Sequence, residues 1–129
     1  MTWLQQSKEI SAITLFVQSV AVSKAFYATA FDAVVYYEDD VSVVFKFGST
    51  LINLLQEGQA YELISPAKVA DASTGSRMQF TITVDDVDSV CAELASRGVA
   101  LLNGPIDRPW GIRTAAFSDP DGHVWELAH

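Results

Sequence analysis

Residues 80–98, FTITVDDVDSVCAELASRG, repeat the pattern of residues 13–31, ITLFVQSVAVSKAFYATAF. The matching positions carry apolar side chains in both segments: Ile13 and Phe80, Leu15 and Ile82, Val17 and Val84, Val20 and Val87. Farther along the chain, residues 48–55 (GSTLINLL) match residues 121–128 (DGHVWELA). Two copies are too few to stack into a solenoid array. We therefore expect a duplicated module whose two copies share one core.

The second copy shows most clearly which elements the module contains. Residues 79–84 (QFTITV) alternate polar and apolar side chains, which predicts a strand with one packed face. Asp85 and Asp86 are typical of a helix N-terminus, and the apolar residues after them recur at helical spacing until Gly98 ends the helix. The rest of the copy predicts a strand at 99–102, a loop rich in Pro and Gly, a strand at 112–118, a turn at 119–122 and a strand at 123–128.

The first copy has the same order of elements, so the chain predicts a β-α-β-β-β module twice. Its strands are expected at 12–17, 34–38, 42–47 and 50–56, with a helix at 20–31. We expect a single domain over residues 1–129, with module 1 at about 10–57, a linker at about 58–77 and module 2 at about 78–129. The expected fold class is α+β, with two βαβββ modules forming a curled mixed β-sheet cup and the helices outside. The sheet faces that the helices leave free would line the cup.

Length, charge and cysteine content narrow the class of protein. The chain has 129 residues, enough for one domain with a sizeable core, and its formal net charge is −8 at pH 7. That charge argues against nucleic acid or an anionic membrane surface as partner, and no apolar stretch approaches the roughly 20 residues of a membrane span. Cys91 is the only cysteine, so no internal disulfide forms, and the N-terminus lacks a secretory signal pattern. We expect a cytoplasmic protein.

Three motifs make the chain similar to the vicinal-oxygen-chelate superfamily, the group of glyoxalases, bleomycin resistance proteins and extradiol dioxygenases. They are residues 23–27 (SKAFY) after the first strand, residues 80–87 (FTITVDDV), and the closing residues 117–127 (FSDPDGHVWEL). The resemblance covers nearly the whole chain. It implies paired βαβββ modules, a small-molecule ligand in the cup, and a homodimer that completes or shields the cup.

Metal-dependent members of the superfamily hold a divalent ion with up to four side chains, taken from the first and last strand of each module. The resemblance places these positions at Ala12, Asn53, Gln79 and Glu126, and the repeat pairs the first with the third and the second with the fourth. Ala12 cannot bind a metal, and neither histidine of the chain occupies a ligand position, which excludes the facial triad of ring-cleaving dioxygenases. The possible metal ligands that remain are the carboxylate of Glu126 and the side-chain amide oxygens of Asn53 and Gln79. We therefore expect no resident metal or other cofactor, with a weakly held divalent ion as the alternative.

Two functions fit these residues. The first is a metal-free binder, similar to bleomycin resistance proteins and so to antibiotic resistance, that holds a small planar or cationic molecule in the cup. The alternative is a glyoxalase I-like enzyme, of the lactoylglutathione lyase type, in which Glu126 acts as the base beside a weakly held divalent metal. The sequence leaves open which of the two applies, and so whether the chain is an enzyme.

Glu126 is the candidate catalytic residue. In another interpretation it only bonds Gln79 or Asn53 and fills the space of a lost metal. The ligand-binding candidates are Gln79, Asn53, Phe47, Trp110 and Arg113.

Phe47, Trp110 and Arg113 are candidates because of their positions along the chain. Phe47 belongs to a strand whose alternation sends some aromatic side chains into the cup. Trp110 and Arg113 belong, with Arg108, to the loop that is longer in the second copy, where they could gate or stack on a ligand. Trp125 is expected to pack against the second helix.

Overall fold

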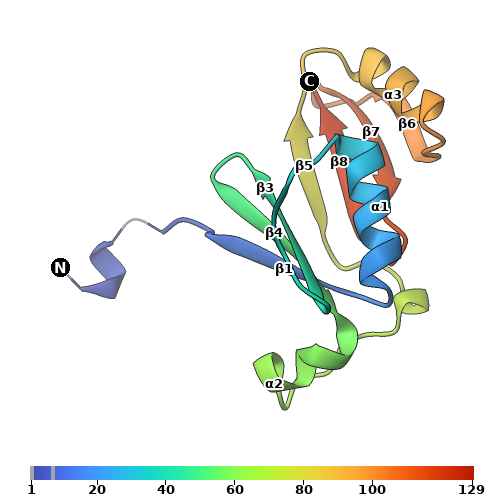
Figure 1. The fold of residues 1–129 in the computed structure, drawn as a ribbon. Helices are drawn as coiled ribbons and strands as arrows, with labels where there is room; N and C mark the ends of the chain where they lie inside the picture. Colours follow the sequence, from blue (N-terminus) through green and yellow to red (C-terminus); the bar gives the residue numbers. More distant parts are fainter. Residues whose placement is uncertain (1, 7) are drawn as a thin grey trace.

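The computed structural model describes residues 2–6 and 8–129 of the chain (Figure 1). The first module comprises β1 (Ala12–Val17), α1 (Val20–Phe31), β2 (Val35–Glu38), β3 (Ser42–Phe47) and β4 (Thr50–Gln56). The second comprises β5 (Gln79–Thr83), α3 (Val87–Ser96), β6 (Leu101–Asp107), β7 (Arg113–Ser118) and β8 (Val124–Ala128). The linker between them carries η2 (Glu57–Gln59), α2 (Ala60–Ile64) and η3 (Ala72–Thr74), and η1 (Trp3–Gln5) precedes β1.

Each module forms its own four-stranded mixed sheet, in the order β1-β4-β3-β2 and β5-β8-β7-β6. The first and last strands of each module are parallel neighbours, and the other pairs are antiparallel. This pairing places Thr14 opposite Asn53 in the first sheet and Thr81 opposite Glu126 in the second. The α+β fold class with two βαβββ modules is therefore confirmed.

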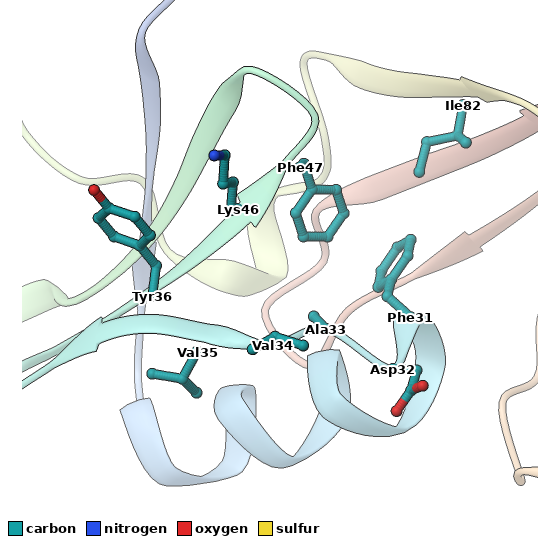
Figure 2. A pocket seen from close by; sticks show the side chains of 9 residues that line it. All are labelled: Phe31, Asp32, Ala33, Val34, Val35, Tyr36, Lys46, Phe47 and Ile82. Atoms are coloured by element: carbon teal, nitrogen blue, oxygen red, sulfur yellow. The ribbon is translucent and has the colours of Figure 1, made fainter.

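Side-chain caps determine where the two long helices begin. The Ser19 hydroxyl accepts from the backbone N–H of Val22 at the start of α1, and Asp86 accepts from the N–H of Ser89 at the start of α3. Asp32, with φ of 50°, ends α1 in the left-handed conformation and turns the chain toward β2, as Figure 2 shows. Asp86 lies in the predicted capping segment, so that prediction is confirmed. Among the described residues, no helix is long and apolar enough to cross a membrane.

β6 differs most from its predicted extent. We expected a strand at 99–102 followed by a loop, but the strand spans Leu101–Asp107 and includes Gly104 and Pro105. Its register with β7 shifts around Gly104, where a Cβ atom would lie 2.5 Å from the carbonyl oxygen of Thr114. Only glycine fits so close a backbone approach at φ of 90°, so Gly104 marks a bulge within the strand.

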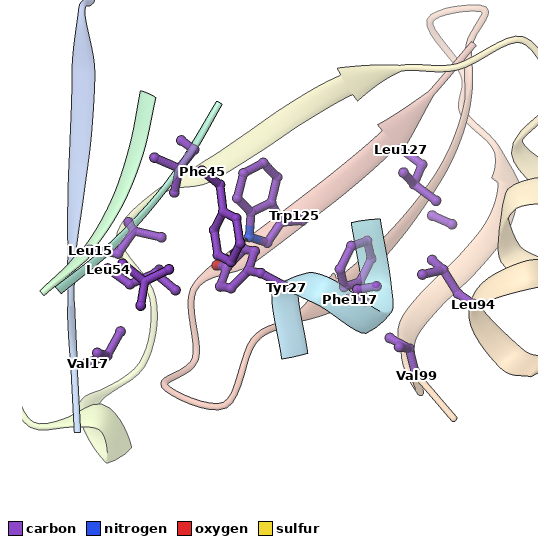
Figure 3. Close-up of a cluster of buried hydrophobic side chains, with 14 of the residues drawn as sticks. Leu15, Val17, Tyr27, Phe45, Leu54, Leu94, Val99, Phe117, Trp125 and Leu127 are labelled. Carbon is purple, nitrogen blue, oxygen red and sulfur yellow. Dashed lines mark hydrogen bonds between the residues drawn. The ribbon is translucent and has the colours of Figure 1, made fainter. Parts of the chain in front are cut away.

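The two modules share one core, and α1 lies between their sheets (Figure 3). The Tyr27 ring of α1 lies 6.0 Å from the ring of Phe45 on β3 and 6.0 Å from the ring of Trp125 on β8. Phe47 of β3 also contacts Trp125 directly, with ring centroids 5.5 Å apart. The apolar faces of both sheets therefore meet around one helix. Trp125 was expected to pack against the second helix, and its ring contacts in the structure include Tyr27 and Phe31 of α1.

Strand alternation determines what the opposite faces of the sheets carry, and we call these the outer faces. In β4, Asn53 alternates with two buried core residues, so it belongs to the outer face of the first sheet. In β8, Glu126 alternates with Trp125 and Leu127 of the core, so it belongs to the outer face of the second sheet. The candidate positions are therefore turned away from the shared core.

Candidate functional site

On the outer face of the first sheet, Asn53 pairs with Thr14 and keeps one buried oxygen without a partner. The Asn53 amide Nδ2 donates to the Thr14 hydroxyl over 3.4 Å, across the parallel β1–β4 pair. The Asn53 Oδ1 atom is buried, and no described residue donates to it. A buried acceptor left unpaired costs about 1–3 kcal/mol, so a ligand donor at this oxygen would be stabilising. Ala12 lies on the same face and adds no ligating atom.

On the outer face of the second sheet, Glu126 is held by Thr81. The Thr81 hydroxyl donates to Glu126 Oε1 over 3.0 Å, between direct neighbours of the parallel β5–β8 pair. The interpretation in which Glu126 bonds Gln79 or Asn53 is therefore wrong within one chain. Gln79 lies exposed on the same face, and Glu126 Oε2 accepts no hydrogen bond from the described residues. That oxygen is available to a ligand.

Asn53 and Glu126, with their hydrogen-bond partners, form two separate groups within one chain. Asn53 and Glu126 each bond inside their own sheet, and both outer faces point away from the shared core. The expectation that Asn53, Gln79 and Glu126 surround one hollow is therefore not met by a single copy. Within one chain, residues 2–6 and 8–129 contain no group of three or more His, Cys, Asp or Glu side chains that could hold an ion.

Arg108 is a further polar group on the outer face of the second sheet. Its Nε atom donates to Thr114 Oγ1 over 2.9 Å, and its Nη2 atom donates to Asn103 Oδ1 over 3.3 Å. Thr114 is buried on this face, two residues before Ala116, which is the register partner of Glu126. The sequence placed Arg108 in a loop, and it lies directly after the end of β6 at Asp107. Its bonds to Thr114 and Asn103 join separate parts of the sheet, which the local pattern does not show.

Arg113 was predicted to bind a ligand, and in the structure its guanidinium group is bonded to two acidic side chains. Its Nε and Nη2 atoms donate to Asp88 on α3 over 2.7 and 2.9 Å, and its Nη1 atom donates to Asp107 over 3.0 Å. These bonds lower the pKa of Asp88, and they raise that of Arg113. Arg113 therefore links β7 to α3 on the helix side of the sheet, and its contact with a ligand stays a prediction. Trp110 is 68% exposed in the loop before β7. Its contact with a ligand stays a prediction.

Phe47 lies on the inner side of its sheet, opposite to the face that carries Asn53. Its ring lies 5.1 Å from the ring of Phe31 at the end of α1. Both rings line a hollow of about 490 Å³ that also contacts Val34 and Ile82 (Figure 2). Phe47 also lines a hollow of about 580 Å³ together with Gln79 and Thr81. Its contact with a ligand stays a prediction, on the core side of β3 and not on the face of Asn53.

A buried polar network joins the start of β8 to α1. The Asp119 carboxylate accepts from the Tyr27 hydroxyl and from His123 Nδ1, each over 2.7 Å, and from the backbone N–H groups of Asp121 and His123. Trp125 Nε1 donates to the Tyr27 oxygen over 3.0 Å. Burial alone would raise the pKa of Asp119, but the bonds from His123 and Tyr27 outweigh it and lower that pKa. The same bond raises the pKa of His123 against the effect of burial.

Residues 9–127 match the family model of the Glyoxalase/Bleomycin resistance protein/Dioxygenase superfamily, and the chain belongs to that superfamily. Among curated proteins it is 33% identical to the uncharacterized protein YraH of Bacillus subtilis over 86 residues, which is 65% of this chain and 67% of YraH. It is 26% identical to a virulence protein of Salmonella typhimurium over 124 residues, which is 92% of this chain and 82% of that protein.

A solved structure of a glyoxalase/bleomycin resistance protein/dioxygenase from Nocardioides superposes with a TM-score of 0.85 at 20% identity. The superposition covers 95% of this chain and 83% of that one. At this identity the likeness shows the fold. The family match confirms the resemblance that the sequence motifs indicated.

Proposed function

We propose that the chain is a metal-free binder of a small planar or cationic molecule, held on the outer faces that carry Asn53 and Glu126. The observation that carries the proposal is the buried Asn53 Oδ1 atom, to which no described residue donates. Asn53 Oδ1 and Glu126 Oε2 are both acceptors, so they suit ligand N–H groups or an ammonium group. Sequestering a toxic compound in this way would amount to antibiotic resistance, which is one activity in the name of the superfamily.

The proposal includes a cup formed between two copies of the chain. One copy cannot place Asn53 and Glu126 around one ligand, because both outer faces point away from its core. A homodimer in which the first sheet of each copy faces the second sheet of the other brings Asn53 opposite the partner's Glu126. Gln79 and Thr81, which are exposed in the single chain, lie on a face that such a dimer would cover.

The first test measures binding of proflavine, a planar cation that carries ring and amino N–H groups, by fluorescence titration. Asn53→Ala and Glu126→Gln should each weaken binding roughly tenfold, since each removes one acceptor for a charged or N–H donor group. Glu62→Gln, which changes an exposed glutamate of α2, is the matched control and should bind like the parent. Unchanged affinity in both test variants would remove the two residues from the site.

A mixture of the two variants tests the two-copy cup. A mixed dimer of Asn53→Ala and Glu126→Gln holds one cup with both changes and one cup with neither. In an equal mixture, tight binding should therefore return to about a quarter of all cups. Failure to recover tight binding, in a mixture that native mass spectrometry shows to contain mixed dimers, would contradict this arrangement.

Glyoxalase-like chemistry is the second candidate, favoured by the free Oε2 atom of Glu126. Thr81 holds only one oxygen of that carboxylate, so the other can take a proton from a carbon next to a carbonyl. Turnover of methylglyoxal–thiol adducts, measured with and without added Ni²⁺, Zn²⁺ or Mn²⁺, decides between the two functions. Turnover that Glu126→Gln abolishes, together with a stoichiometric metal, would replace the binding proposal. Without turnover and without bound metal, the binding proposal stands.

A further inference from the structure

The outer face of the second sheet carries one carboxylate among neutral side chains. The strand register places four residues of this face in one row across the sheet and four more in the row beside it. The first row is Thr81, Glu126, Ala116 and Asn103, and the second row is Thr83, Ala128, Thr114 and Ile106. Glu126 is the only charged residue of the two rows, and the described residues leave its Oε2 atom free.

Arg108 adds a positive charge to the same face. It follows the end of β6, and its side chain reaches back to Thr114 and Asn103 in the two rows. These bonds use two of the five N–H donors of its guanidinium group, which leaves three for a ligand. Both acceptors are neutral, and within residues 2–6 and 8–129 Arg108 forms no ion pair. The acid beside it in the chain, Asp107, is bonded to Arg113 on the helix side of the sheet.

The guanidinium group of Arg108 is held at a fixed place near Glu126. Thr114, which accepts from Nε over 2.9 Å, is 1% exposed, so this bond keeps the end of the side chain against the sheet. Asn103 and Glu126 are both register partners of Ala116, one on each side of β7. Because neighbouring strands lie about 4.8 Å apart, the guanidinium group and the Glu126 carboxylate are separated by roughly 5–10 Å. Only the methyl group of Ala116 lies between them in the row.

These two charges place different demands on a ligand that covers the face. A cation at Glu126 that carries no negative group would be repelled by Arg108 across the same face. It would also leave the guanidinium group covered and without a counter-charge, which is costly. A carboxylate on the ligand removes both penalties, and a guanidinium group is suited to bind it through two parallel N–H bonds.

We propose that the ligand of the outer faces is a small zwitterion, with a cationic N–H group at one end and a carboxylate at the other. The cationic end donates to Glu126 Oε2, the carboxylate accepts from Arg108, and the flat part between them rests on Ala116. This inference rests on the proposed function, because it takes Glu126 as the place of the cationic end. It makes Arg108 the residue that selects zwitterions over simple cations.

The test compares 4-guanidinobenzoate with its methyl ester, which keeps the cation and the flat ring but has no negative charge. By calorimetric titration, the parent protein should bind the acid at least tenfold more tightly than the ester. Arg108→Gln should remove this preference by weakening the acid at least tenfold, with no loss for the ester. Arg108→Lys keeps the charge without the planar fork and should keep part of the preference. Arg97→Gln, which removes a positive charge at the end of α3, is the matched control and should bind both probes like the parent.

Proflavine gives a second readout, because it carries no carboxylate and should bind Arg108→Gln at least as tightly as the parent. Equal affinity for the acid and the ester in the parent, or an unchanged preference in Arg108→Gln, would overturn the inference. Weaker proflavine binding in Arg108→Gln would also overturn it, since Arg108 would then support the face as a whole. Failure of the proposed function gives a different pattern, in which Asn53→Ala and Glu126→Gln leave the binding of proflavine and of the ester unchanged.

Discussion

The Tyr27 hydroxyl links α1, the helix against which both modules pack, to β8 and the turn before it. It donates to Asp119 over 2.7 Å and accepts from Trp125 Nε1 over 3.0 Å, and all three side chains are buried. Tyr27→Phe removes only this oxygen, since the phenyl ring keeps its contacts with Phe45 and Trp125. The change therefore isolates the polar contribution of the network.

The expected loss of unfolding free energy is about 3 kcal/mol. A hydrogen bond to a charged group contributes about 1.5–3 kcal/mol, and a buried donor left unpaired, here the Trp125 N–H, costs about 1–3 kcal/mol. The expected loss lies in the lower half of the sum of these two ranges, because Asp119 keeps His123 and two backbone N–H groups as partners. A loss of this size is a large part of the roughly 5–15 kcal/mol that stabilises a typical domain.

Urea unfolding followed by tryptophan fluorescence measures this loss. The midpoint should fall while the slope of the transition stays that of the parent, because the surface exposed on unfolding is unchanged. Tyr36→Phe, at a tyrosine that is 64% exposed on β2, is the control and should change the free energy by less than about 0.5 kcal/mol. A loss below about 1 kcal/mol in Tyr27→Phe would refute the reasoning.

Three further predictions concern charge and backbone. The lowered pKa of Asp119 gives stability that is present above pH 3.8 and lost at lower pH, and the raised pKa of His123 gives stability that is present below pH 6.5 and lost at higher pH. Urea midpoints across pH should therefore peak between these values, and His123→Gln should remove the fall on the alkaline side. Arg113→Ala should lower the urea midpoint only slightly, because its side chain is 36% exposed and solvent screens its ion pairs. In thermal unfolding, Gly104→Ala should cost about 3 kcal/mol or more, whereas Gly58→Ala, with open space around it, should cost less than about 1 kcal/mol.

The sequence was sufficient to predict the element order, because local patterns determine it. Alternation in residues 79–84 and helical spacing after Asp86 each concern neighbours along the chain. The structure accordingly has β5 and α3 where these patterns lie, and the repeat extends the same order to the first module. The full length of β6 was not predicted for the same reason, since its bulge at Gly104 interrupts the local pattern.

The contacts between elements could not be predicted in this way. An alternating strand shows which of its faces is apolar, but it does not show which helix covers that face. Trp125 faces the core side that the pattern requires, but its aromatic neighbours Tyr27 and Phe31 lie on α1, which the pattern could not indicate. The ion pair of Arg113 could not be predicted either, because its partner Asp88 lies on another element, 25 positions away in the chain.

The position of α1 has a consequence for the history and the cooperativity of the fold. A lone ancestral half would have left one aromatic side of this helix in water, so it would have needed an identical half to close its interior. Fusion of the two halves made that association permanent, which makes unfolding of either half costly for the other. Proteolytic cleavage within the linker should accordingly yield two fragments that stay together instead of drifting apart.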